Sequence, residues 1–323
     1  MPSGEDDLIG RYFKPIATDP GALGLADDAA ILKGDRDDLV ITTDAIVEDV
    51  HFLSGDPPET VARKALRVNL SDLAAKGATP AGFVMSLALR NADEGWLASF
   101  ARGLDDDATT FGCPLLGGDT VATPGPLTIS VTAFGRVPPG EMILRSGAEP
   151  GDRIVVSGTI GDAALGLAIL TEKMTVGDVA IRESLLNRYR IPQPRIGLAG
   201  AVRRYARAAM DVSDGLAGDL AKLCAASGVS AVIDAVSVPL SDAARGLLEQ
   251  GRTCLESVVS GGDDYEILCT IAENRFGDFA RTALSVGVAV TSIGTIVAGD
   301  TAPKWLGAEG KEIALSRLSY SHF

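Results

Sequence analysis

The sequence predicts an α/β protein with mixed sheets, divided into two domains. Runs of aliphatic and β-branched residues alternate with amphipathic segments along the 323 residues of the chain, and this alternation is typical of α/β folds. Some neighbouring strand segments are joined by links too short for a crossover connection, so antiparallel pairs are also expected. Domains usually contain roughly 100–200 residues, and the chain length therefore favours two.

The first half of the chain has the composition of alternating strands and helices. β-Branched and aliphatic runs predict strands at residues 29–33, 38–47, 80–90, 113–118 and 127–137. Helices are predicted at residues 59–77 and 94–112, and the first of them closes at Gly77 with Pro80 beyond it.

The segment 145–153 contains Gly and Pro and has no hydrophobic periodicity, which is typical of a linker. We therefore expect domains at residues 1–148 and 149–323. In the second half, strands are predicted at residues 153–158, 208–213, 229–236, 256–261, 265–271 and 288–297. Helices are predicted between residues 158 and 206 and at residues 215–228, 241–250 and 274–287.

Composition excludes several classes of protein. No apolar run approaches the roughly 18 residues that a membrane-spanning helix requires, and the N-terminal segment lacks the apolar region of a secretion signal. The four cysteines form no CxxC pair, as expected for thiols in the reducing cytoplasm. The net charge of −14 disfavours nucleic-acid binding, because phosphate backbones attract basic surfaces.

Aspartates recur at the ends of the predicted strands or in the turns that follow. They are Asp27, Asp28, Asp44, Asp119, Asp211, Asp214, Asp263 and Asp264. A single such residue is usually a turn former or a helix cap. Their repetition indicates a ligand site, because ligands in α/β folds gather at strand ends.

Asp72 is the most informative single residue. It falls on the apolar stripe of the predicted 59–77 helix, together with Val61 and Val68. A carboxylate on this face needs a partner, because burial of an unpaired charge is costly. The partner is either a lysine, Lys64 or Lys76, or a metal ion.

Convergence of Asp28, Asp44, Asp72 and Asp119 would require cations. Two carboxylates about 4 Å apart repel by roughly 4 kcal/mol at an effective dielectric constant of about 20. Oxygen ligands favour Mg²⁺, which binds through a few carboxylates together with substrate phosphates. Calcium is the alternative, but the spacing in residues 211–215 does not fit an EF-hand loop.

The sequence lacks a P-loop, a GxGxxG fingerprint and the protein-kinase signatures. The turn between Gly158 and Gly161 lies between a predicted strand and a predicted helix. It is either an anion seat at a helix N-terminus or a tight turn with no ligand.

Seven short motifs together resemble the thiamine-monophosphate kinases, and the likeness extends from Gly4 to Phe323. The motifs are TTD (42–44), VEDVHF (47–52), NLSDLAAKGA (69–78), LGGDT (116–120), RSGA (145–148), AMDVSDGL (209–216) and SGGDDYE (260–266). The resemblance implies the fold of the aminoimidazole-ribonucleotide-synthetase-like ATP-binding enzymes. It also implies a homodimer in which the N-terminal sheets of two subunits pair.

The resemblance implies that ATP phosphorylates thiamine monophosphate to thiamine diphosphate by direct in-line transfer with several Mg²⁺ ions and no catalytic side chain. The implied metal ligands are Asp28, Thr42, Thr43, Asp44, Asp72, Asp119, Asp211 and Asp214. The implied nucleotide residues are Gly118, Asp119, Arg145 and Ser213. The implied thiamine-phosphate residues are His51, Asp263 and Tyr320.

Two details of this assignment depart from the family pattern or depend on it. The family more often has Glu where this chain has Asp263, and Asp28 is chosen over Asp27 because the second carboxylate of the family pair is the ligand. The alternatives are another enzyme of the superfamily, such as a purine-pathway synthetase, or a non-catalytic module that binds nucleotide or metal. A selenophosphate synthetase is disfavoured because no Cys precedes Cys113, and a hydrogenase-maturation protein because the chain does not end in Cys.

Overall fold

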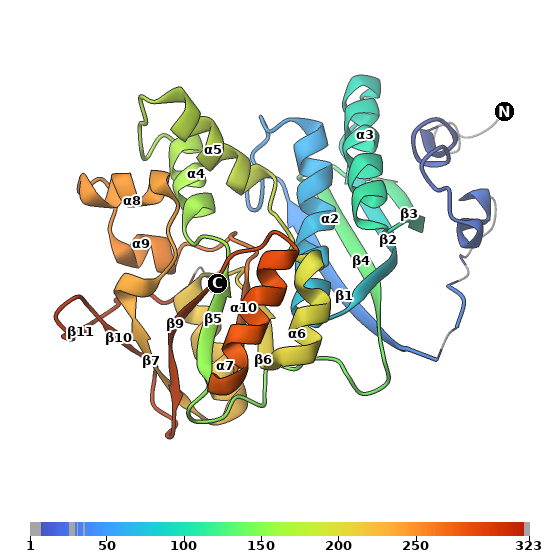
Figure 1. Cartoon of the computed structure of the whole chain (residues 1–323). Helices are drawn as coiled ribbons and strands as arrows, with labels where there is room; N and C mark the ends of the chain where they lie inside the picture. The colour runs from blue at the N-terminus through green and yellow to red at the C-terminus, as the bar shows by residue number, and fades with distance from the viewer. Residues whose placement is uncertain (1–7, 26–29, 31, 35, 320–323) are drawn as a thin grey trace. The chain divides into compact units, whose positions relative to one another are not determined.

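The computed structural model describes residues 8–25, 30, 32–34 and 36–319, and they form two compact units (Figure 1). Unit 1 comprises the chain up to Leu73 together with Thr79–Gly140, and unit 2 comprises Ala74–Ala78 and the chain from Glu141 onward. The chain therefore enters unit 2 briefly at the end of one helix, returns to unit 1, and leaves it for good after Gly140.

Unit 1 is a four-stranded mixed sheet with two long helices. Its elements are η1 (Ile9–Phe13), η2 (Pro20–Leu25), β1 (Asp38–Val47), α2 (Pro58–Ala75), β2 (Thr79–Leu89), α3 (Glu94–Phe111), β3 (Leu115–Ala122) and β4 (Thr128–Val137). The sheet order is β1-β4-β2-β3. β4 is antiparallel to both β1 and β2, whereas β3 is parallel to β2. The predicted mixture of parallel and antiparallel pairs is confirmed.

The two faces of this sheet differ in burial. In β4, buried and half-buried residues alternate along the whole strand, because successive side chains point to opposite faces. The opposite face carries exposed apolar residues: Ile41 is 60% exposed, Val121 48% and Leu39 44%. Unit 1 therefore has one covered sheet face and one open face that is partly apolar.

Unit 2 is a seven-stranded mixed sheet of order β11-β10-β7-β9-β5-β8-β6. Its strands are β5 (Arg153–Ser157), β6 (Ala206–Asp211), β7 (Ser230–Asp234), β8 (Ile267–Ile271), β9 (Val290–Val297), β10 (Lys304–Leu306) and β11 (Glu312–Ile313). Its helices are α4 (Asp162–Leu170), α5 (Val179–Arg190), α6 (Ala199–Tyr205), α7 (Leu216–Ser227), α8 (Asp242–Glu249), α9 (Leu255–Val259) and α10 (Phe276–Ser285). Short 3₁₀ turns lie at Ile196–Leu198, Ala235–Ser237 and Glu273–Arg275.

Both faces of the unit 2 sheet are covered. One buried cluster joins alternate strand residues to Leu216, Leu220 and Leu223 of α7. The other joins the intervening strand residues to α6 and α10, through residues such as Val202 and Phe279. Helices on both faces of a sheet are the arrangement expected of an α/β unit.

Two strand predictions are wrong. Residues 256–261 were expected as a strand, but Leu255–Val259 forms the short helix α9. A short apolar run fits either element, and here Val258 and Val259 are both buried on the helix. At the predicted 29–33 strand, Ala30, Leu32 and Lys33 lie in no strand, while Ala29 and Ile31 fall outside the described residues. The turns η1 and η2 and the hairpin β10–β11 were not predicted.

In the part of the chain that the structure describes, no helix is both long enough and apolar enough to cross a membrane.

Candidate active site

Two predicted motifs of unit 1 meet where β1 lies beside α2. The Thr42 hydroxyl donates to the Asp72 carboxylate, with 2.5 Å between the oxygens. Two residues further along β1, the Asp44 amide donates to the side-chain oxygen of Asn69, at 3.0 Å. Asn69 is fully buried and also donates to the Ala65 carbonyl, which fixes its amide group. The structure therefore brings Thr42 and Asp72 into contact and ties the backbone of Asp44 to the same helix.

Asp72 is half-buried. Lys76, one of its two predicted lysine partners, donates to the Ala209 carbonyl within unit 2, at 2.8 Å.

Thr43 points to the opposite face of the sheet. Its hydroxyl donates to the Val131 carbonyl at 3.2 Å, and it accepts from the Thr132 hydroxyl at 3.0 Å. Alternation along a strand requires this, because Thr42 and Asp44 share one face and Thr43 the other. The three consecutive predicted ligands therefore do not present their side chains in one direction.

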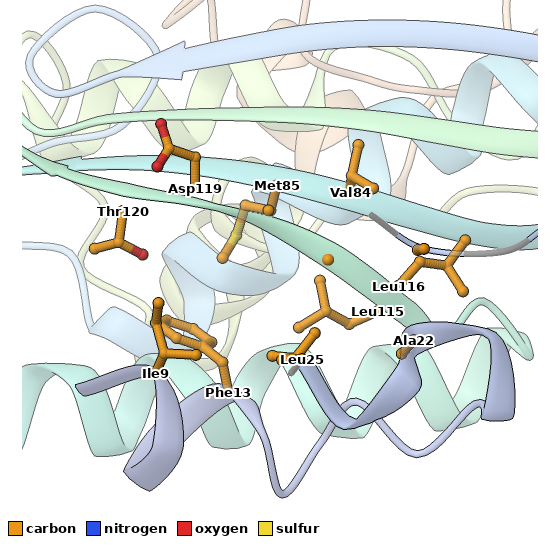
Figure 2. A pocket seen from close by; sticks show the side chains of 13 residues that line it. Ile9, Phe13, Ala22, Leu25, Val84, Met85, Leu115, Leu116, Asp119 and Thr120 are labelled. Atoms are coloured by element: carbon orange, nitrogen blue, oxygen red, sulfur yellow. The ribbon is translucent and has the colours of Figure 1, made fainter. Parts of the chain in front are cut away.

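Gly118 and Asp119 lie on β3, an edge strand of the unit 1 sheet. A cavity of about 340 Å³ follows this edge, between β3 and the N-terminal turns η1 and η2. Ile9, Phe13 and Leu25 face the strand from these turns (Figure 2). One end of the cavity is thus apolar, while Asp119 and Thr120 give the other end polar groups. Concave sites of this size and mixed lining commonly bind small molecules.

The two glycines of the β3 motif, Gly117 and Gly118, differ in whether packing requires glycine at their positions. A Cβ on Gly118 would lie 1.9 Å from the Met85 carbonyl oxygen, so strand packing alone requires glycine there. A Cβ on Gly117 would meet nothing within 4 Å. Packing therefore explains Gly118, whereas Gly117 leaves the backbone open to a ligand that approaches closely.

Asp119 is separated from the Thr42–Asp72 pair. β1 and β3 are the two edges of a four-stranded sheet, and a spacing of about 4.8 Å between strands puts them roughly 14 Å apart. Among the described residues, no group of three or more His, Cys, Asp or Glu side chains is placed to hold a metal ion. Asp28, the remaining predicted ligand of unit 1, lies outside the described residues.

His51 lies in a tight turn after β1. Its ring Nδ1 accepts from the Val47 amide at 3.0 Å, and its own amide donates to the Val47 carbonyl at 2.8 Å. Asp49 in the same turn has a φ of 62°, a value that non-glycine residues adopt rarely. Since Nδ1 is an acceptor, the neutral ring carries its proton on Nε2, which makes Nε2 a donor.

In unit 2, two aspartate-bearing loops are joined through their backbones. The Val212 amide donates to the Glu266 carbonyl, the Asp263 amide to the Ser213 carbonyl and the Tyr265 amide to the Val212 carbonyl, each at 2.8 Å. Asp263 and Tyr265 have φ values of 63° and 51°. Strained residues held by surrounding hydrogen bonds are a feature of functional loops. The predicted residues of both loops therefore belong to one pair of hydrogen-bonded loops: Asp211, Ser213, Asp214 and Asp263.

Asp219 fixes the first of these loops. It has no exposed surface, and one of its carboxylate oxygens accepts from the amides of Ser213 and Asp214 at 3.1 and 3.0 Å. Its other oxygen accepts from the Lys222 ammonium at 2.8 Å. Lys222 also donates to the Asp214 carboxylate at 2.5 Å. Burial raises the pKa of Asp219, although its contact with Lys222 opposes the shift.

Glu266 fixes the second loop. Its buried carboxylate accepts from Ser157 at 2.6 Å, from Arg188 at 2.9 Å and from Arg195 through two guanidinium nitrogens. A Cβ on Gly158 would lie 2.1 Å from Glu266 Oε1, so the turn after β5 needs glycine at that point.

The neighbouring Asp264 bonds to the turn that ends at Gly161. Both of its carboxyl oxygens accept from the Gly161 amide, at 2.9 and 3.0 Å, at the start of α4. Burial raises the pKa of Asp264 well above its ordinary value, and the Gly161 amide opposes the shift. The Gly161 amide at this helix N-terminus is therefore bonded by the chain's own carboxyl group.

The sequence patterns placed Asp264 among the aspartates of a predicted ligand site and Glu266 in a motif without a role, and they did not reveal Arg188, Arg195, Asp219 and Lys222. The one available signal was that Asp219 and Lys222 are three residues apart on a predicted helix, within contact distance of each other.

Arg145 lies on the segment that precedes β5, and it is exposed. Ser227, at the end of α7, donates to the Arg145 carbonyl at 3.3 Å and accepts from the Ala148 amide at 3.2 Å. A single hydroxyl thus holds both ends of this segment. Tyr320 lies outside the described residues.

Family models identify the class of protein. Residues 26–137 match the N-terminal domain of AIR synthase related proteins, and residues 149–304 match their C-terminal domain. The chain is 45% identical to the thiamine-monophosphate kinase of Caulobacter vibrioides, over 99% of this chain and 91% of the relative. It is 40% identical to the enzyme of Escherichia coli, over 100% of this chain and 99% of the relative.

Solved structures agree. The crystal structure of thiamine-monophosphate kinase from Stenotrophomonas maltophilia is 38% identical, with a TM-score of 0.85 over 96% of this chain and 98% of that one. A structure described as AaThiL complexed with AMPPCP and TMP is 31% identical, with a TM-score of 0.79 over 92% of this chain and 91% of that one. The chain belongs to the thiamine-monophosphate kinase family. The family and the two-domain fold predicted from the sequence are confirmed.

Proposed function

We propose that this chain transfers the terminal phosphoryl group of ATP to thiamine monophosphate, giving ADP and thiamine diphosphate. The observation that carries the proposal is the likeness over the whole length of the chain to relatives with this name. The solved structure described as a complex with AMPPCP and TMP supports the same pair of substrates. Phosphoryl transfer depends mainly on alignment and charge neutralisation, and the two fixed aspartate loops of unit 2 suit this need.

The residues present fit magnesium in their chemistry. Every proposed ligand offers a carboxylate or hydroxyl oxygen: Asp28, Thr42, Thr43, Asp44, Asp72, Asp119, Asp211 and Asp214. Mg²⁺ binds through one or two carboxylates together with substrate phosphates and water. The contact between Thr42 and Asp72 offers one such carboxylate, and Asp211 and Asp214 lie three residues apart at the end of β6. The ion, when bound, would neutralise phosphate charge next to these acidic side chains.

For the nucleotide, we propose that the cavity beside β3 receives the base and that Gly118 and Asp119 lie next to the phosphates. The apolar side chains of η1 and η2 suit a flat heterocycle. Arg145 and Ser213 are further nucleotide contacts that the family resemblance implies, and a guanidinium group such as that of Arg145 binds phosphate through two parallel hydrogen bonds.

For the acceptor, His51, Asp263 and Tyr320 are the proposed contacts. The attacking oxygen belongs to a phosphate that is already anionic near neutral pH, so a general base is dispensable. His51 can donate from Nε2 to this phosphate, because Nδ1 is held by Val47. Asp263, shorter by one methylene than the more common Glu, is held by its backbone bond to Ser213.

We further propose a cytoplasmic homodimer that forms through the open face of the unit 1 sheet. Leu39 and Ile41 are exposed side by side on β1, and Val121 is exposed on the other edge strand, β3. Exposed apolar patches mark interaction surfaces. The four cysteines are all free thiols, which suits a reducing compartment.

The test is a product assay. Purified protein is mixed with ATP, thiamine monophosphate and Mg²⁺, and thiamine diphosphate and ADP are separated by chromatography. We expect equal amounts of both products, and none after a chelator removes the divalent cation. Absence of thiamine diphosphate at saturating Mg²⁺ would reject the proposal. ATP binding without turnover would instead favour a non-catalytic module.

A further inference from the structure

Lys222 bridges two carboxylates of different character. Its ammonium lies 2.8 Å from Asp219, whose side chain is 0% exposed, and 2.5 Å from Asp214, whose side chain is 40% exposed. Asp219 has further donors in the amides of Ser213 and Asp214. Asp219 therefore remains satisfied when one contact is lost, whereas the bond between Lys222 and Asp214 is the exchangeable one.

The cation lies where a proposed metal ligand would have to act. Asp214 points its carboxylate at Lys222, so a divalent ion that approaches Asp214 meets a positive charge within a few ångströms. Lys222 itself is 43% exposed, and its four-carbon chain allows the ammonium to swing away while it keeps Asp219. The loop is thus held in two ways: permanently by Asp219, and reversibly by Lys222.

We propose that Lys222 is an internal counter-ion of the Asp211–Asp214 loop, which neutralises Asp214 until a divalent cation displaces it and thereby weakens the affinity of the loop for that cation. The inference rests on the proposed function at one point, the role of Asp214 as a ligand. Lys222 acts through Asp214 and is a positioning residue. Removal of the Lys222 charge should strengthen metal binding. If Lys222 had only a structural role, its removal would not strengthen metal binding.

The experiment measures Mn²⁺ binding to the whole protein without nucleotide, by the electron paramagnetic resonance signal of free Mn²⁺. Lys222→Met is expected to lower the Kd of the weakest resolved site at least about fivefold, because a nearby positive charge is lost. Lys222→Arg should bind as the wild type does. The matched control is Lys311→Met, since Lys311 is an exposed lysine of unit 2 paired with Glu309 at 2.6 Å. Its Kd should not change.

An unchanged or higher Kd in Lys222→Met would overturn the inference. If this variant does not fold, Lys222→Gln keeps a hydrogen-bond donor without the charge and carries the same expectation. Asp214→Asn tests whether Asp214 binds the metal at all. If Mn²⁺ binding is the same in this variant, Asp214 is not a ligand and the proposed role of Lys222 fails with it. Failure of the kinase assignment appears elsewhere, as absence of thiamine diphosphate in the product assay with wild-type protein.

Discussion

The Thr42 hydroxyl on β1 donates a hydrogen bond to the Asp72 carboxylate on α2, and the two oxygen atoms are 2.5 Å apart. Residues 30 positions apart in the sequence are thus joined side chain to side chain. Since the threonine acts as the donor, its oxygen keeps lone pairs that can still accept or bind a cation.

Asp72→Asn should abolish most of the kinase activity without unfolding the protein. The amide is neutral and can still accept from Thr42, so the folded state should lose little stability. The proposed metal ion, in contrast, loses a negatively charged ligand. We expect kcat to fall by about 100-fold or more, with a melting temperature within a few degrees of the wild type. Asp105→Asn, a half-buried aspartate of α3, is the control and should keep its rate. Near-normal turnover in Asp72→Asn would make Asp72 a structural residue.

The adjacent glycines of β3 should respond differently to alanine. Gly117→Ala has room for its methyl group, so we expect normal thermal stability and a raised KM for ATP. Gly118→Ala places a methyl group against the Met85 carbonyl, and overpacking of this kind costs about 1–3 kcal/mol. Urea denaturation and initial rates measure the two effects. Equal stability losses in both variants would contradict this explanation.

Glu266→Gln should destabilise unit 2. Two arginines donate to the buried carboxylate, and removal of one partner of a buried ion pair typically costs about 3–5 kcal/mol. The free energy of unfolding, measured in urea, should fall by an amount of this order. Glu273→Gln breaks the exposed pair with Arg153 and is the control, for which we expect no resolvable change. A Glu266→Gln variant as stable as the wild type would show that the network contributes little.

The pH dependence of stability should contain a contribution from Asp152. Burial raises the pKa of Asp152 to about 6 from the ordinary value of 3.8. The folded state therefore binds this proton more tightly than the unfolded state, and the stabilisation present below about pH 4 is lost as the pH rises through about 6. In Asp152→Asn this loss is absent, so the stability of the variant relative to wild type should rise by roughly 1–3 kcal/mol across that window. Denaturant titrations at several pH values measure it, and a constant difference would refute the assignment.

Ile41→Glu should dissociate the proposed dimer. Ile41 is 60% exposed on the open sheet face, so a charge there is harmless to the monomer but unfavourable in an apolar interface. Sedimentation velocity should give a single species of half the wild-type mass, with unchanged far-UV circular dichroism. Leu284→Glu is the control, because Leu284 is 73% exposed on α10 of unit 2, and it should leave the mass unchanged. A wild type that is monomeric at all concentrations would remove the dimer from the proposal.

Local sequence patterns predicted most of the fold. The periodicity of residues 59–77 predicted α2, and the glycine and proline that follow predicted its end, because these signals act within a few residues. The run around Val258 was misassigned, since five residues are too few for the two periods to be distinguished. The short helical segments η1 and η2 have neither period, and they lie against α3 and β3, respectively.

The sequence predicted the residue types of the site but not the contacts that hold these residues in place. Alternation along β1 already implied that Thr43 and Asp44 point to opposite faces. In contrast, Glu266 meets Arg188 and Arg195 across 78 and 71 positions, and no local pattern encodes such a contact. Asp219 resembled an ordinary acid of a first helical turn. Its hydrogen bonds from the Ser213 and Asp214 amides, together with its burial, show that it holds the preceding loop.

The carboxyl group of Asp264, seated on the Gly161 amide at the beginning of α4, limits how this fold can take hold of a nucleotide. Many enzymes present a bare helix start to a phosphate and let backbone dipoles provide the attraction. Here that position is occupied from within, and the turn after β5 is tied to the loop that carries Asp263. Attraction for a polyphosphate must then come from groups other than the Gly161 amide, such as basic side chains or the cations proposed above.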